Sequence, residues 1–170
     1  LEEAGGDKEK ALLILRKKSS DIAAKKSDRI LGSGTVASYI HGTGSIGSLV
    51  ELSCEPDFVS KNDEFKALAY DIAMHIAASN PQFVKKEEVT EEMKKKISDI
   101  FEAEVKDKPE ALRPKILAGK IDAYLKEKIL LEQPFIKNPD LTVADLIAGA
   151  IQKFGEKTEI RRFTRFSVSE

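Results

Sequence analysis

The chain has 170 residues, and its 28 Lys and Arg residues nearly balance its 29 Asp and Glu residues, giving a formal net charge of −1. This balance excludes a strong overall field that would attract nucleic acid or a membrane surface. No apolar run approaches the roughly 18 to 20 residues that a membrane-spanning helix requires, so we expect no membrane partner. The single cysteine, Cys54, excludes an internal disulfide and a cysteine-cluster metal site.

The length fits one compact domain with room for a small appendage. A single cysteine is most simply explained by a reducing compartment, and we expect a cytoplasmic protein. Because Leu1 is not a methionine, we also expect the numbering to begin inside a longer chain. A targeting segment ahead of it would make an organelle matrix the alternative location.

The N-terminal part is expected to be a helix followed by a linker. Residues 1–18 are predicted to be helical, because Asp7 can cap the helix and a short apolar stripe follows it: Ala11, Leu12 and Leu15. A helix this short is marginal on its own. Residues 19–34 are polar and basic, which predicts a linker that leads into a strand.

Two strands and a long helix come next. Alternating apolar residues predict strands over residues 35–41 and 47–54, and the glycine-containing connection between them has the length of a hairpin loop. A helix is predicted over residues 62–78, with acidic residues in its first turn. Its apolar residues recur at the spacing of one buried face: Phe65, Leu68, Ala69, Ile72 and Ile76.

The middle of the chain predicts two further helical stretches. Thr90 is expected to cap the first, whose apolar face consists of Met93, Ile97, Ile100, Phe101 and Val105. Pro109 is well placed for the first turn of the second stretch. This stretch is expected to be interrupted at Gly119 and to continue toward Lys128.

The C-terminal part combines a loop, a helix and a strand. Residues 130–139 contain two prolines and are predicted to be a loop. Thr142 can cap a helix that Gly155 ends, and residues 158–168 predict a final strand. Strands separated by helices in this way predict an α+β fold. We expect a small antiparallel sheet of about three strands packed against several helices, preceded by a helical N-terminal remnant.

Residues that could carry out catalysis are few. Strand alternation places Cys54 on the same face as Val50 and Leu52, which predicts a buried structural cysteine. The two histidines, His41 and His75, lack the spacing and the companion carboxylate of a helical metal site. The chain has no G-x-x-x-x-G-K-[ST] phosphate-binding loop. We therefore expect neither enzymatic activity nor a cofactor or bound metal.

The turn Glu55-Pro56-Asp57-Phe58-Val59 places an acid beside a large aromatic residue, between a strand and a helix. Most such turns simply close over a core. The alternative is a wedge, in which Phe58 points outward to enter another protein and Asp57 fixes its approach. Aromatic residues are the usual anchors of interfaces, and Pro56 would stiffen the turn.

His75 borders the apolar face of the helix predicted over residues 62–78, roughly 80° from the centre of that face at about 100° per residue. One interpretation is a half-buried histidine with a satisfied hydrogen bond. The other is a contact with a partner protein.

Asp57-Phe58-Val59 is similar to the Thr-Asp-Phe-Val signature of the elongation factor Ts family, with Pro56 where the family usually has threonine. The resemblance extends over nearly the whole chain. Further matching segments, in the family's order, are Ser38-Tyr39-Ile40-His41-Gly42, Ile46-Gly47, 73–78, Gln133-Pro134-Phe135 and 162–166. It implies that residues 1–18 are the end of a ubiquitin-associated-type helical module. Residues 19–34 would be a linker and residues 35–170 the exchange-factor core, which dimerises.

Members of this family exchange the guanine nucleotide of elongation factor Tu, and the resemblance implies that partner. The residues implied to bind it are Asp57, Phe58, Val59, Ile46, Gly47 and His75. The acid and the phenylalanine would enter the G domain beside its magnesium and phosphate site and displace contacts to both. Because one half-length core carries both sets of contact motifs, the resemblance also implies a homodimer.

Two other functions are alternatives. The segment 159–166 mixes arginine with aromatic residues, which can stack on bases and bind phosphate in RNA. Strict alternation, however, places Ile160, Arg162, Thr164, Phe166 and Val168 on one face, and we expect some of the arginines to pair with acids around a core sheet. We therefore do not expect a nucleic-acid partner. The second alternative is an adaptor that binds elongation factor Tu without exchange activity.

Overall fold

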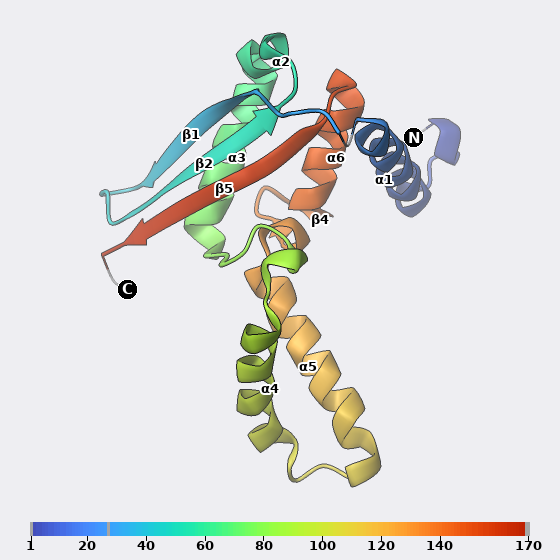
Figure 1. Cartoon of the computed structure of the whole chain (residues 1–170), viewed down its shortest axis with the longest axis vertical. Coiled ribbons are helices and arrows are strands. Elements are labelled where there is room, and N and C mark those ends of the chain that lie inside the picture. The colour runs from blue at the N-terminus through green and yellow to red at the C-terminus, as the bar shows by residue number, and fades with distance from the viewer. Residues whose placement is uncertain (1, 27, 169–170) are drawn as a thin grey trace. The chain divides into compact units, whose positions relative to one another are not determined.

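A computed structural model of the chain describes residues 2–26 and 28–168 (Figure 1). The chain divides into two compact units, one formed by residues 1–80 with 134–170 and the other by residues 81–133. In the part that the structure describes, no helix is both long and apolar enough to cross a membrane. The first unit combines an antiparallel sheet with helices, which confirms the predicted α+β fold.

The first unit is built on a three-stranded antiparallel sheet in the order β1-β2-β5. The strands are β1 (Ser33–His41), β2 (Ile46–Cys54) and β5 (Thr158–Ser167). The β1–β2 hairpin turns through Gly42 and Gly44, both at positive φ, where a side chain would be strained. The two strands predicted over residues 35–41 and 47–54, and the hairpin that joins them, are confirmed.

A bulge in β5 decides which of its side chains face the helices. Glu51 pairs with Arg162 but Leu52 pairs with Ile160, so Arg161 is an extra residue in the ladder. Ile160 consequently shares the buried face with Leu52, whereas Arg162 lies on the exposed face. The prediction that Ile160 and Arg162 share one face is wrong, because alternation cannot continue across a bulge.

Helix α3 (Asp63–Ser79) covers one face of the sheet and runs behind it in Figure 1. Asn62 caps it by accepting a hydrogen bond from the Glu64 N–H at 2.8 Å. Four residues of the predicted stripe are buried, namely Phe65, Ala69, Ile72 and Ile76, whereas the fifth, Leu68, is half-buried. The predicted helix is confirmed, but the short helix α2 (Asp57–Lys61), which precedes it, was expected to be a turn.

Helix α1 (Lys8–Lys25) packs on helix α6 (Val143–Phe154). Arg16 donates two hydrogen bonds to Asp145, at 2.7 and 3.0 Å, and the Ser19 hydroxyl donates to the Ala148 carbonyl at 2.7 Å. Burial alone would raise the pKa of Asp145. The hydrogen bonds from Arg16 and from Thr142 in the capping box outweigh this effect, so the pKa of Asp145 is lowered.

The predicted boundary of the N-terminal helix is wrong. The helix starts at Lys8 and extends through Lys25, into the segment 19–34 that was expected to be a linker. The reason is tertiary: Ser19 is buried against α6, so a polar stretch becomes helical through packing that composition does not reveal. Its assignment to a ubiquitin-associated-type module stays a prediction.

A small hairpin completes the first unit. Strands β3 (Pro134–Phe135) and β4 (Asn138–Thr142) pair antiparallel, although part of this segment was expected to be a loop. The Lys137 ammonium contacts Asp71 of α3 at 2.6 Å, so the hairpin is tied to that helix.

The second unit pairs helix α4 (Glu91–Val105) with helix α5 (Arg113–Lys128). Its core consists of Val89, Leu125 and Ile129, with Phe83, Ile97, Ile121 and Tyr124 packed against it. The expected interruption at Gly119 is wrong, because a glycine costs a helix only about 1 kcal/mol relative to alanine and α5 is held by its packed neighbours. Ile100, expected in the apolar face of α4, is 65% exposed.

Candidate functional site

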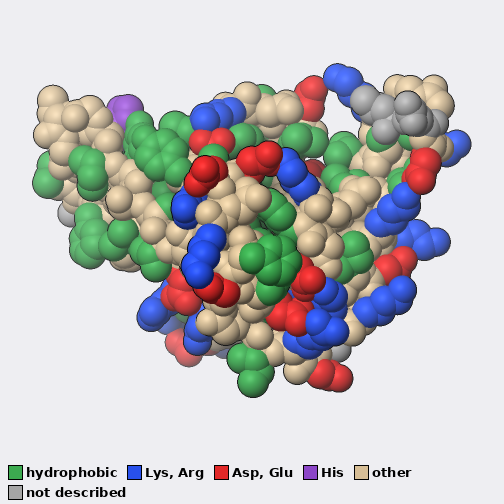
Figure 2. Space-filling model, turned by 90° about the horizontal axis from the view of Figure 1, so that it is seen from above, with side chains coloured by type: hydrophobic (Ala, Val, Ile, Leu, Met, Phe, Trp, Pro, Cys, Tyr) green, Lys and Arg blue, Asp and Glu red, His purple; other side chains and the backbone are tan. Residues whose placement is uncertain are grey.

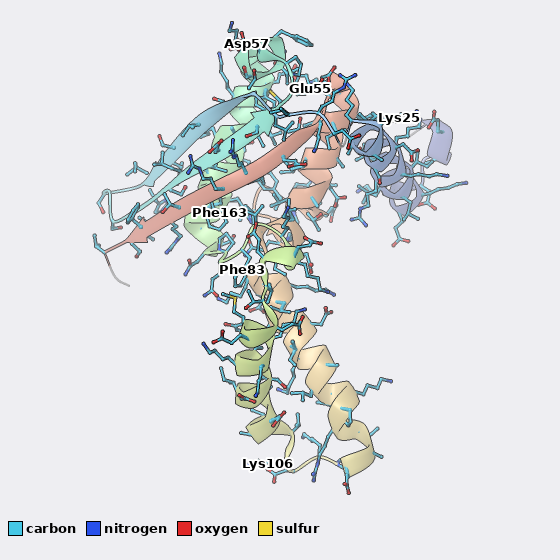
Figure 3. The ribbon with its side chains drawn as sticks, viewed as in Figure 1. Lys25, Glu55, Asp57, Phe83, Lys106 and Phe163 are labelled. Carbon is cyan, nitrogen blue, oxygen red and sulfur yellow. The ribbon has the colours of Figure 1, made fainter. Side chains whose placement is uncertain are left out.

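Helix α2 carries Phe58 out of the surface at one end of the sheet. The Phe58 side chain is 68% exposed, whereas its neighbour Val59 is fully buried. Figure 3 shows the labelled Asp57 of the same helix at this end of the sheet, and Figure 2 looks onto the same end of the sheet. Of the two interpretations of this turn, the structure supports an outward-facing Phe58.

Local bonds and burial together hold α2 in place. A five-residue helix is unstable in isolation. Its first turn is closed by the Val59 N–H, which donates to the Pro56 carbonyl at 3.2 Å, and by the Ser60 hydroxyl, which donates to the Asp57 carbonyl at 2.8 Å. Val59 then anchors the helix in the core, and Phe58 is presented on a defined support.

Asp57 forms an ion pair with Lys61, one helical turn away. A hydrogen bond from the Lys61 ammonium, helped by its charge, lowers the pKa of Asp57, so this carboxylate is charged near neutral pH. Both side chains are largely exposed, and such pairs contribute little to stability. Asp57 is therefore available to a partner at small cost. Sequence reasoning missed Lys61, although its i+4 spacing from Asp57 would have identified it once α2 was expected to be helical.

Ile46 and Gly47 lie at the other end of β2. Eight residue steps of strand separate Ile46 from Cys54, which is about 26 Å at roughly 3.3 Å per residue, and α2 begins beyond Cys54. Gly47 pairs with Ile40 on one side and Phe166 on the other, and these residues line a hollow. The Ile46-Gly47 segment and the Asp57-Phe58 segment therefore form two separate surfaces on one chain.

His75 is fully buried on α3. Its Nδ1 accepts a hydrogen bond from the Ile136 N–H at 3.3 Å, and its ring lies 5.9 Å from that of Phe135. It thereby supports the β3–β4 hairpin from beneath. Helix periodicity predicted only that His75 lies at the edge of the apolar face. It could not predict full burial, because the β3–β4 hairpin that covers this side of α3 comes from a distant part of the chain. Contact between His75 and a partner stays a prediction.

The arginines of β5 are engaged within the sheet. Arg161 and Arg162 contact the Glu51 carboxylate at 3.4 and 2.7 Å. Arg165 donates to the Ala77 carbonyl at 3.0 Å, at the end of α3. The expectation that some of these arginines pair with acids is confirmed, which weakens the argument for phosphate binding.

Cys54 is buried, as predicted, and burial raises the pKa of its thiol. This is the opposite of what an activated nucleophile needs. Within residues 2–26 and 28–168, no three His, Cys, Asp or Glu side chains gather in a way that could hold a metal ion.

Comparison with known proteins identifies the family. The family described as Elongation factor TS matches residues 17–170. Over 172 aligned positions the chain is 52% identical to elongation factor Ts of Carboxydothermus hydrogenoformans, and the match covers 100% of this chain and 79% of that protein. The corresponding values for Desulforamulus reducens are 50%, 100% and 79%, and for Alkaliphilus metalliredigens 51%, 100% and 80%. The chain belongs to the elongation factor Ts family.

Proposed function

We propose that the chain is a guanine nucleotide exchange factor that promotes GDP release from elongation factor Tu during translation. Family membership supports this role. The mechanism is linkage: a protein that binds the empty GTPase more tightly than the GDP-bound form lowers GDP affinity by the same factor. The relatives give no support to an organelle matrix, and we place this activity in the cytoplasm.

The observation that carries the proposal is the exposure of Phe58 above a buried Val59. Burying a phenylalanine side chain in a partner is worth about 1.5–3 kcal/mol, and aromatic anchors of this kind dominate interface energetics. A short helix supported by the core keeps the anchor ordered before binding, which reduces the entropy cost of association.

Asp57 supplies the electrostatic part of the mechanism. As Phe58 enters the G domain, the adjacent carboxylate comes close to the magnesium and phosphate site. A negative charge there repels the phosphates of GDP and competes for magnesium, weakening the strongest contacts to the nucleotide. The exposed Asp57–Lys61 pair and the 3.4 Å hydrogen bond from the Ser60 hydroxyl to the Asp57 carboxylate have to rearrange for this approach.

The open face of the sheet supports a homodimer. Opposite the face that α3 covers, the exposed large apolar side chains are Val36, Ile40, Leu49, Phe166 and Val168. Exposed apolar surface of this kind marks interfaces, and twofold pairing is the commonest way for identical chains to cover it. In a dimer, Ile46-Gly47 of one chain and Asp57-Phe58 of the other contact the same elongation factor Tu, although one chain holds them far apart.

Stopped-flow release of fluorescent GDP from elongation factor Tu tests the proposal. The wild-type chain should accelerate release, and Phe58→Ala should slow the accelerated rate about tenfold or more. Ile100→Ala is the matched control, since it truncates a similarly exposed apolar side chain in the second unit and should leave the rate unchanged. Binding of the wild-type chain without faster GDP release would instead identify an adaptor.

A further inference from the structure

Four charged side chains meet beside the turn that precedes α2. Lys26 and Arg29 come from the connection between α1 and β1, Glu55 from the β2–α2 turn, and Glu156 from the α6–β5 turn. Arg29 pairs with Glu55, Lys26 pairs with Glu156, and Lys26 also lies 3.9 Å from Glu55. We call these four residues the ionic clasp. Glu55 is labelled in Figure 3, near Asp57.

The clasp is more enclosed than the other ion pairs near α2. Side-chain exposures of Lys26, Glu55 and Glu156 are 18, 19 and 20%, against 67% or more for Asp57 and Lys61. The Glu55 Oε2 atom is buried, and no hydrogen-bond donor among the described residues reaches it. The charge of the carboxylate is balanced by the Arg29 guanidinium, which pairs with the Oε1 atom, and by the Lys26 ammonium, 3.9 Å from Oε2. Ion pairs in such surroundings are screened less by salt than fully exposed ones.

The position of Glu55 in the chain connects the clasp to Phe58. Pro56 follows Glu55 and restricts the backbone, and α2 begins at Asp57. Helix α2 is too short to fix its own direction, and Val59 holds it to the core from beneath. Glu55 provides a second attachment, just before the helix starts. The buried Val59 and Ser60 hold the middle of the helix, and Glu55 holds the chain just before its first residue, next to Asp57 and Phe58.

We propose that the ionic clasp positions Phe58, so that Lys26, Arg29, Glu55 and Glu156 are positioning residues for nucleotide exchange. The link to exchange rests on the proposed function of Phe58. The clasp also ties the C-terminal end of α1 to the surface that meets the partner. Loss of the clasp should leave the fold intact, increase the motion of Phe58 and weaken productive binding of elongation factor Tu.

The first test observes Phe58 directly and needs no partner. The chain contains three tyrosines but no tryptophan, so Phe58→Trp introduces a single tryptophan that can be excited at wavelengths tyrosine does not absorb. The anisotropy decay of this tryptophan measures motion of the side chain at position 58. Adding Glu55→Gln or Arg29→Gln should increase the amplitude of the nanosecond motion. Lys18→Gln is the matched control, because it removes an exposed ion pair of α1, with Glu3, and should change nothing. Unchanged decays in both clasp variants would overturn the proposal.

The second test is a double-mutant cycle in the GDP release assay. With Phe58 present, Glu55→Gln should raise the half-saturating concentration of the chain about fivefold and change the maximal rate by less than about twofold. In a Phe58→Ala background, Glu55→Gln should change the half-saturating concentration by less than about twofold. An equal effect in both backgrounds would mean that Glu55 acts without Phe58 and would refute the positioning role. If Phe58→Ala itself leaves exchange normal, the proposed function fails, whereas the anisotropy result still decides whether the clasp orders this site.

Thermal unfolding followed by circular dichroism accompanies both tests. If Glu55→Gln lowers the melting temperature strongly, Arg29→Gln decides the question, because Arg29 is 56% exposed and its truncation leaves no buried cavity. Arg29→Lys keeps the charge and should restore at least part of the wild-type half-saturating concentration. Failure of this rescue, together with unchanged anisotropy, counts against the clasp.

Discussion

At its Cys54 end strand β2 leads into a short helix that lifts Phe58 out of the surface, whereas at its Ile46 end the same strand begins in a hollow over Gly47. At the Cys54 end, the exposed Phe58 lies next to the buried Val59 and the charged Asp57–Lys61 pair. The Ile46 end lies between the exposed side chains of Ile40 and Phe166. A projecting anchor suits insertion into a different protein, and an open sheet face suits pairing with a copy of itself. In the proposed dimer the Cys54 end inserts its anchor into elongation factor Tu, whereas the Ile46 end borders the homodimer contact and also offers Ile46-Gly47 to that partner.

The largest expected effect comes from placing a charge at the Ile46 end. Phe166→Glu should raise the dissociation constant of the proposed homodimer about 100-fold or more, because an unpaired charge buried in an apolar interface costs several kcal/mol. Light scattering at micromolar concentration should then give a mass near 18.8 kDa, that of one chain. Leu13→Glu, which adds the same charge at an exposed site of α1, should keep the wild-type mass. A wild-type mass near that of one chain at every concentration would contradict the dimer itself.

Removing the support beneath Phe58 should have the next largest effect. Val59→Ala should lower the free energy of unfolding by about 1–3 kcal/mol, because it leaves a cavity under α2. Urea unfolding measures this change, and Leu13→Ala at an exposed position should stay within about 0.5 kcal/mol of the wild type. If Val59→Ala leaves the free energy of unfolding unchanged, Val59 does not hold α2 and Phe58 on the core.

A smaller effect is expected for Pro56. Pro56→Thr, which restores the residue usual in the family, should change the GDP release rate by less than about threefold, or under 1 kcal/mol. The reason is that the N-cap position of α2 has an extended backbone, with φ of −95°, which threonine also adopts. A large gain in rate would instead identify a diverged, impaired exchange factor.

The smallest effect concerns the charge of Asp57. Because Lys61 lowers the pKa of Asp57, Lys61→Gln should raise that pKa toward the ordinary value of 3.8, which an NMR pH titration of the carboxyl carbon would measure. A lowered carboxyl pKa stabilises the fold above the unfolded-state pKa, and this contribution is lost as pH falls through the folded-state value. Both groups are exposed, so unfolding at neutral pH should be unaffected. An unchanged pKa would show that the pair does not form in solution.

The parts of the fold that sequence predicted are those that local chemistry determines. Acidic residues in a first turn followed by a helical stripe predicted α3, and a glycine-containing connection predicted the β1–β2 hairpin. Alternation also predicted the burial of Cys54. In each case the deciding residues are close together in the chain, so short-range rules are sufficient.

The features that sequence did not predict depend on contacts between distant residues. The bulge at Arg161 reverses the alternation of β5 only because of its register with β2. Hairpin β3–β4 buries His75, and α6 draws Ser19 into α1. The candidate site shows the same division: the Asp57-Phe58 pair is visible in the sequence, but Glu55 meets Lys26 and Glu156 from parts of the chain that a linear pattern does not connect.

Cys54 gives the chain a natural probe of local opening. It is the only cysteine, it is inaccessible in the closed fold, and it lies two residues ahead of Pro56. A thiol reagent can modify it only when this end of β2 separates from its neighbours, so the labelling rate is the opening equilibrium constant multiplied by the rate for a free thiol. Labelling with and without elongation factor Tu would therefore measure, at one atom and without an engineered label, how much a bound partner protects this end of the sheet.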